Sequence, residues 1–83
     1  MSPSASPRVR VYSRTGCHLC EVALEVVAAV CAATGETFEV VDIDADPELR
    51  ERFTDEVPVT FVDGRQHDFW RVDPDRLRAA LGR

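Results

Sequence analysis

Lysine is absent from this chain of 83 residues: all ten basic residues are arginine, against fifteen acidic residues. The formal net charge is therefore −5. This charge argues against a nucleic-acid-binding protein, because contacts with the phosphate backbone require a basic surface. Any cationic group in a functional site must be an arginine or one of the two histidines.

Long apolar runs are also missing. The longest apolar stretch, within residues 21–33, is interrupted by Glu25. It falls short of the roughly 20 apolar residues that a helix needs to cross a bilayer. Residues 1–7 are rich in serine and proline and have no apolar centre, so we expect a disordered lead-in there and no secretory signal. We therefore expect a protein that does not bind membranes.

An even set of cysteines is missing as well, since the chain has three. A secreted domain held together by disulfides normally has an even count behind a signal peptide. We therefore expect a cytoplasmic protein, in which two closely spaced cysteines bind a metal or carry out redox chemistry. The length allows one small domain, which we assign to residues 8–83.

The hydropathy pattern predicts the element order β-α-β-α-β-β-α. We expect strands over residues 8–13, 38–43, 59–62 and 65–70, and helices from 17 to about 33, over 47–53 and from 74 onward. A β-α-β crossover makes the first two strands parallel, and Asp63-Gly64 is a hairpin signal that adds an antiparallel edge strand. The second strand is apolar enough to be central. This order predicts an α/β fold with a four-stranded mixed sheet.

The first predicted helix has a broad apolar stripe, which indicates packing against a sheet over much of its length. The stripe consists of Leu19, Val22, Ala23, Val26, Val30 and Ala33, widened by Leu24, Val27 and Cys31. Cys31 lies three turns beyond Cys20, outside disulfide reach, and is expected to be a buried small hydrophobe. Phe69 and Trp70 are either core anchors or part of a docking face near the site, and the core is favoured because a domain this small needs large apolar side chains.

Cys17 and Cys20 are separated by two residues, at the point where the first strand passes into the first helix. Unpaired backbone N–H groups and the helix dipole favour a thiolate over a thiol at a helix N-terminus. The second cysteine lies one turn further on the same helix face, where it can attack a mixed disulfide formed by the first. The pair predicts a dithiol redox site.

Two separated segments resemble known ones. The element order, with Cys-x-x-Cys at the end of the first strand, resembles the thioredoxin fold. Residues 11–20, Val-Tyr-Ser-Arg-Thr-Gly-Cys-His-Leu-Cys, are similar to the active-site segment of glutaredoxins. Residues 56–64, Glu-Val-Pro-Val-Thr-Phe-Val-Asp-Gly, are similar to the Val-Pro segment that leads into that family's hairpin. The resemblance covers residues 8–82 and identifies a glutaredoxin-like protein with helices on both faces of the sheet.

The resemblance implies roles for individual residues. Cys17 matches the nucleophilic cysteine and Cys20 the resolving cysteine. Pro58 matches the proline that follows a cis peptide bond beside the disulfide. The backbone N–H and C=O of Val57 would then pair with an extended thiol substrate like an added strand.

Three further residues are candidates for substrate binding. Arg14 stands where many glutaredoxins have lysine, and it could stabilise the Cys17 thiolate or contact a substrate carboxylate. Tyr12 ends the first strand near the motif, where it could line the substrate groove or serve packing alone. His18 belongs to the exposed rim; direct proton exchange with a neighbouring thiol remains an alternative.

The resemblance also leaves one landmark unmatched. Glutaredoxins usually have a Gly-Gly pair after the hairpin that allows close approach of glutathione, but residues 67–70 here are His-Asp-Phe-Trp. The reductant is therefore open between glutathione, another low-molecular-weight thiol and a flavoprotein of the thioredoxin-reductase type. We expect a monomer without a bound cofactor that reduces disulfides of proteins or of small thiols.

A metal or iron–sulfur carrier is the alternative function. Cys17 and Cys20 would supply two thiolates and His18 a third donor, whereas a closed zinc or cluster site needs four ligands. Such a site would therefore need a dimer or added thiols. We predict a thiol–disulfide oxidoreductase and no metal.

Overall fold

The computed structural model describes residues 7–53 and 57–82. Its elements are β1 (Val9–Ser13), α1 (His18–Thr34), β2 (Phe38–Asp42), a short 3-10 helix η1 (Ile43–Ala45), α2 (Pro47–Phe53), β3 (Val59–Val62), β4 (Arg65–Phe69) and α3 (Pro74–Leu81). This is the predicted order, with the 3-10 helix added after β2. The expected lead-in at 1–7 lies outside the described residues except for Pro7.

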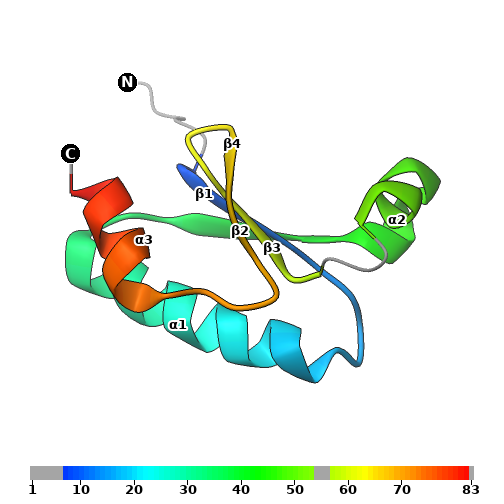
Figure 1. Ribbon diagram of the computed structural model, residues 1–83, viewed down its shortest axis with the longest axis horizontal. Coiled ribbons are helices and arrows are strands. Elements are labelled where there is room, and N and C mark those ends of the chain that lie inside the picture. Colours follow the sequence, from blue (N-terminus) through cyan, green and yellow to red (C-terminus); the bar gives the residue numbers. More distant parts are fainter. Residues whose placement is uncertain (1–6, 54–56, 83) are drawn as a thin grey trace.

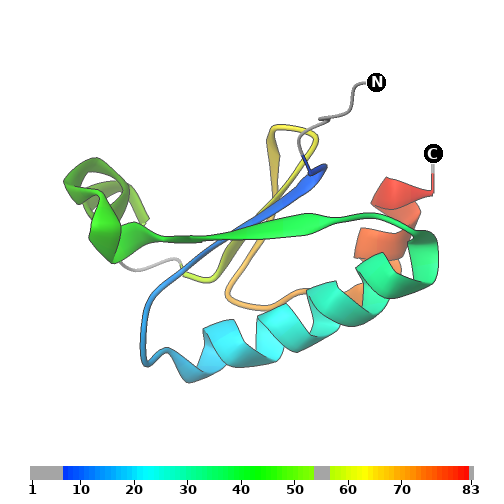
Figure 2. The same ribbon diagram turned by 180° about the vertical axis from the view of Figure 1, so that it is seen from behind.

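The four strands form one mixed sheet in the order β2-β1-β3-β4. β1 pairs with β2 in parallel and with β3 in antiparallel orientation, and β3 pairs with β4 as a hairpin. Both turn residues of that hairpin, Asp63 and Gly64, have positive φ, as in the type I′ turns that suit hairpins. α1 and α3 cover one face of the sheet, while α2 lies at the end of the sheet where β1 and β2 finish (Figures 1 and 2).

Local signals in the sequence account for the helix ends. The Asp73 carboxylate accepts hydrogen bonds from the N–H groups of Asp75 and Arg76, and Pro74 follows at the first helical position. Gly35 ends α1 in the left-handed conformation with φ 78°, which glycine adopts at little steric cost. These caps explain why the predicted bounds of the helices agree with the observed ones.

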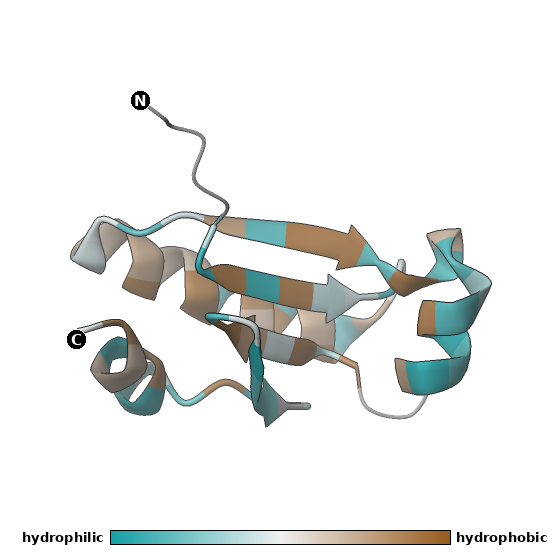
Figure 3. Ribbon diagram, turned by 90° about the horizontal axis from the view of Figure 1, so that it is seen from above, coloured by the Kyte–Doolittle hydropathy of each residue, from teal (hydrophilic) through white to brown (hydrophobic). Residues whose placement is uncertain are grey.

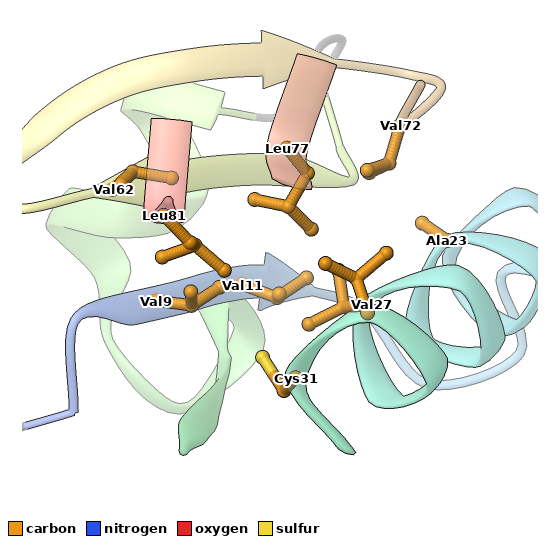
Figure 4. Packing of buried hydrophobic residues seen from close by; sticks show 10 residues of the cluster. Val9, Val11, Ala23, Val27, Cys31, Val62, Val72, Leu77 and Leu81 are labelled. Carbon is orange, nitrogen blue, oxygen red and sulfur yellow. The ribbon is translucent and has the colours of Figure 1, made fainter. Parts of the chain in front are cut away.

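The main core lies between the sheet and the α1–α3 layer. Hydrophobic and hydrophilic residues alternate along β1 (Figure 3), so that Val9 and Val11 face this layer. Leu77 and Leu81 of α3 point into the same space, opposite Val27 of α1 (Figure 4). A second, smaller cluster of Ile43, Phe53 and Val59 occupies the other face of the sheet. Phe53 belongs to α2, so this helix packs against the second face, and the expected helices on both faces of the sheet are confirmed.

Three expectations about burial need correction. β2 is an edge strand rather than a central one, and its Val40 is 47% exposed. Ala33 is exposed, and Leu19 and Val22 are each 45% exposed, so the sheet covers only part of the α1 stripe. Trp70 is 51% exposed instead of lying in the core. Cys31 is buried as expected.

Among the described residues, none of the helices has the length and apolar character that a membrane crossing requires.

Candidate redox site

Cys17 lies directly before α1 and caps it. Its backbone is extended, with φ −90° and ψ 113°, and its Sγ accepts a hydrogen bond from the Cys20 N–H at 3.3 Å. This N–H is one of the donors that the first turn of a helix leaves without a backbone partner. A donor aimed at the sulfur stabilises negative charge there. Cys17 is also partly exposed, so its sulfur can meet a substrate.

Cys20 lies on the inner side of the same turn and is only 2% exposed. Burial raises the pKa of the Cys20 thiol to about 11, and its hydrogen bond with Cys17 acts in the same direction. A hydrogen bond from the Arg14 main chain acts against this shift. The pair therefore combines an accessible sulfur with a protonated, buried one, and all three cysteines of the chain are free thiols.

Arg14 acts on Cys20 through a main-chain hydrogen bond and, to a smaller extent, through its positive charge, both of which lower the pKa of the Cys20 thiol. Its guanidinium contacts the Asp44 carboxylate of η1, with Nη2 to Oδ1 at 3.2 Å and Nε to Oδ2 at 3.3 Å. The next residue, Thr15, donates from Oγ1 to Oδ2 of Asp42 at 3.5 Å. These contacts tie the turn before Cys17 to the segment after β2, so Arg14 holds the turn in place. Its expected role in substrate binding stays a prediction.

His18 and Tyr12 lie in different surroundings. The His18 side chain is exposed on the rim, with Nδ1 3.9 Å from Oε1 of Glu21. Tyr12 lies on the opposite face of the sheet from α1, in the second hydrophobic cluster. Its ring stacks on Phe53 with centroids 4.9 Å apart and meets Phe61 edge-on at 5.4 Å. Packing thus accounts for Tyr12, and a binding role for either residue stays a prediction.

The Val57–Pro58 peptide bond is cis, as the resemblance implied, and Pro58 is buried. The Pro58 carbonyl accepts a hydrogen bond of 2.7 Å from the Trp70 N–H. Trp70 has φ 66°, a left-handed conformation that costs a bulky residue roughly 1–2 kcal/mol. The loop between β4 and α3 is therefore tied to the Val57–Pro58 segment.

A groove of about 330 Å³ runs beside the cysteine pair, between α1 and this loop. It is lined by His18, Leu19, Val22, Ala23, Val26, Trp70, Arg71 and Val72. Sequence reasoning did not identify this groove, because it assigned Leu19 and Val22 to the packed interior and favoured the core for Trp70 over a docking face near the site. Two signals were available: the excessive width of the α1 stripe, and the docking-face alternative for Phe69 and Trp70. Four strands cannot cover apolar side chains on so many sides of a helix.

Within the described ranges, no three His, Cys, Asp or Glu side chains gather closely enough to hold a metal ion. A metal on Cys17 and Cys20 would therefore need donors from outside these residues. Reversible formation of a disulfide between the two cysteines is the chemistry that this arrangement supports directly.

Comparison with known proteins identifies the family of this chain. A family model described as Glutaredoxin-like domain (DUF836) matches residues 8–82. An uncharacterized protein of Mycobacterium tuberculosis is 37% identical over 82 residues, spanning 93% of this chain and 84% of the relative. A structural genomics target protein from X. campestris has 37% identity and a TM-score of 0.74, over 89% of this chain and 95% of that one.

A solved glutaredoxin structure has the same fold as this chain. The holo form of glutaredoxin C1 from populus superposes with a TM-score of 0.59 at 22% identity, covering 92% of this chain and 84% of that one. At this identity the likeness concerns the fold alone. The match over residues 8–82, together with the Cys17–Cys20 pair at the start of α1, shows that the chain belongs to the Glutaredoxin-like domain (DUF836) family.

Proposed function

We propose that this protein is a thiol–disulfide oxidoreductase that works through both Cys17 and Cys20. The observation that carries the proposal is the asymmetry of the pair. Cys17 is partly exposed and receives the Cys20 N–H on its sulfur, whereas the Cys20 thiol is buried behind it. A dithiol enzyme requires one sulfur that substrates can reach and one that attacks only from inside.

In the first step, the Cys17 thiolate attacks one sulfur of a substrate disulfide. A bond forms between Cys17 Sγ and that sulfur, the substrate S–S bond breaks, and the other sulfur leaves as a thiolate that takes a proton from water. The Val57 backbone is proposed to pair with the substrate chain at this stage, as an added strand would. Arg14 precedes the motif and His18 lies between the two cysteines, and both are proposed to contact the substrate.

In the second step, Cys20 loses its proton and attacks Cys17 Sγ. The Cys17–Cys20 disulfide forms, the mixed disulfide breaks, and the second substrate sulfur leaves as a thiolate. The substrate gains two electrons and the protein loses two. A low-molecular-weight thiol or a flavoprotein reductase then returns two electrons to the pair. We propose that a monomer in the cytoplasm carries out this cycle.

The test is the redox state of the three cysteines, read by alkylation and mass spectrometry across defined redox buffers. We expect one two-electron transition to a Cys17–Cys20 disulfide, with Cys31 alkylated only after unfolding because it is buried. Cys17→Ser should abolish reduction of a small disulfide, and Cys20→Ser should accumulate mixed disulfides at Cys17. Cys31→Ala is the matched control and should retain the reaction.

Two results would contradict the proposal. One is a Cys17→Ser variant that still reduces disulfides at the original rate. The other is a cysteine pair that resists alkylation until a chelator is added, together with stoichiometric zinc or visible absorbance in the purified protein. That second result would favour the metal carrier.

A further inference from the structure

The apolar side chains exposed beside the cysteine pair indicate which substrates the site takes. We propose that the groove between α1 and the β4–α3 loop binds a polypeptide, by means of an apolar side chain next to the polypeptide's own disulfide-forming cysteine. This inference rests on the proposed disulfide reduction and adds its substrate class. The occupant is a segment of a protein that has an apolar side chain beside its cysteine and no basic residue. It is not a small polar thiol such as glutathione.

The position of the groove identifies its occupant. His18 and Leu19 are the two residues between the cysteines, and both line the groove. A substrate joined to Cys17 therefore places the atoms next to its own cysteine over this wall. Along α1, the nine residues from His18 to Val26 span about 12 Å, because the eight steps between them each rise 1.5 Å. Roughly four extended residues of a bound chain would cover that length.

The surface of the groove is unusually apolar for an exposed site. The large hydrophobic residues that are most exposed in the described part of the chain are Leu19, Val22, Val40 and Trp70. Three of these four lie in this groove. Single apolar residues scattered over a surface need no explanation, but a cluster at a concave site marks a binding surface. An apolar side chain of a substrate would remove this cluster from water.

The backbone holds the aromatic wall in position. Trp70 adopts a left-handed φ of 66°, and its N–H donates to the Pro58 carbonyl at 2.7 Å. A bulky residue keeps such a conformation only where its surroundings hold it, and such residues cluster at ligand sites. The same hydrogen bond joins the groove wall to the segment proposed to pair with the substrate chain. Both contacts with a polypeptide would thus form on one connected surface.

The charge of the groove lining indicates which charge the bound segment has. The described lining residues include Arg71 and His18 and no carboxylate, although the whole chain has a net charge of −5. A basic segment would meet Arg71, whereas backbone carbonyls or an acidic side chain would complement it. Glutathione offers carboxylates but no apolar side chain, so it would leave Leu19, Val22 and Trp70 in water.

The experiment compares matched probes with the pre-reduced protein in a single turnover, which needs no external reductant. Two synthetic heptapeptides each have one cysteine in a mixed disulfide with 2-mercaptoethanol, and they differ only in a Leu or a Ser after that cysteine. The mixed disulfide of glutathione with 2-mercaptoethanol is the third probe, and bis(2-hydroxyethyl) disulfide is the fourth. The second-order rate constant for oxidation of the cysteine pair is measured for each.

We expect the Leu peptide to react about tenfold faster than the Ser peptide and the glutathione probe, since one well-placed apolar group gives discrimination of this order. Val22→Ser should reduce the Leu-to-Ser ratio to about two. Val40→Ser removes the same side chain at a similar exposure from the edge of the sheet, and it should preserve the tenfold ratio. A Leu peptide with a Lys in place of an uncharged residue should react a few-fold more slowly, because the Lys would meet Arg71.

A second measurement does not depend on turnover. Trp70 is the single tryptophan of the chain, so its fluorescence reports on the groove alone. With Cys17→Ser, the thiol form of the Leu peptide should shift the Trp70 emission to shorter wavelength at concentrations where the Ser peptide does not. Trp70→Gly removes the ring and suits a positive φ, so it tests the aromatic wall with the backbone intact. It should also lower the Leu-to-Ser ratio.

The outcomes separate this inference from the proposed function. Equal rates for the two peptides, a ratio that Val22→Ser leaves unchanged, or a glutathione probe as fast as the Leu peptide would each overturn the polypeptide assignment while leaving disulfide reduction standing. If bis(2-hydroxyethyl) disulfide and all other probes fail to oxidise the pair, the proposed function falls and this inference falls with it.

Discussion

At the scale of single residues, the two cysteines differ because one helix turn places them in different surroundings. Spacing alone puts Cys17 at the cap and Cys20 on the same face of α1. The sequence therefore predicts which sulfur attacks and which resolves. It does not predict that Cys20 is buried to 2% exposure or that the Arg14 main chain approaches its sulfur, because both depend on how the turn before α1 packs.

The pH dependence of the second step follows from this burial. Because the pKa of the Cys20 thiol is raised to about 11, only a small fraction is thiolate near neutral pH. In the mixed disulfide the contribution of the Cys17 thiolate is lost, while burial persists. We expect the resolving rate to rise about tenfold per pH unit between pH 6 and 9, since the rate follows the thiolate fraction.

Stopped-flow quenching of the mixed disulfide measures this rate. Cys20→Ser is the control, in which the mixed disulfide should persist across the whole pH range. A resolving rate independent of pH between 6 and 9 would contradict the buried, protonated state of Cys20.

Contacts of a single charged residue also hold the fold together near the start of β1. Arg8 forms a two-point ion pair with Asp63, each contact at 2.9 Å, and donates to Glu36 and to the Leu81 carbonyl. The hydrogen bond to Arg8 lowers the pKa of the Asp63 carboxyl. One arginine thus connects the hairpin, the end of α1 and the end of α3. The sequence contains all four residues but gives no sign of their convergence.

At the scale of elements, α3 depends on its cap. The Asp73 carboxylate satisfies the N–H groups of Asp75 and Arg76 at 2.9 and 3.3 Å. Asp73→Ala should lower the free energy of unfolding by about 1 kcal/mol, because both donors then lose their side-chain partner. Urea denaturation followed by circular dichroism measures the loss.

Asp75→Ala is the matched control for the cap. It removes the same charge from the first turn, together with one exposed ion pair with Arg78 at 3.6 Å, but no acceptor at the cap. The Asp75 side chain is almost fully exposed. We expect a change below about 0.5 kcal/mol. Equal losses in the two variants would show that charge near the helix start, rather than the cap, stabilises α3.

At the scale of the whole molecule, stability rests on the layer between the sheet and the two helices that cover it. Leu77 is fully buried there, among side chains of β1, α1 and α3 (Figure 4). Leu77→Ala should destabilise the protein by about 2–5 kcal/mol, through lost burial and the cavity left behind. Leu19→Ala, on a half-exposed leucine, should cost less than about 1 kcal/mol.

Thermal and urea unfolding of these two variants compare the core with the groove. A loss for Leu19→Ala as large as that for Leu77→Ala would mean that the α1 stripe is packed over its whole width, contrary to the exposure of Leu19. A small loss for both would place the stabilising core elsewhere.

Local interactions account for what could be predicted without the structure. Period-two and helical hydropathy patterns, the Asp73-Pro74 start, the Gly35 stop and the Asp63-Gly64 turn act over a few residues, so they were sufficient for the element order and the location of the cysteine pair. Contacts between distant residues decided the rest. They make β2 an edge strand, bury Cys20, direct Arg14 to Asp44 and place Trp70 in one groove with residues of α1. A hydropathy pattern shows which side chains are apolar, but only the packed elements determine which of them remain exposed.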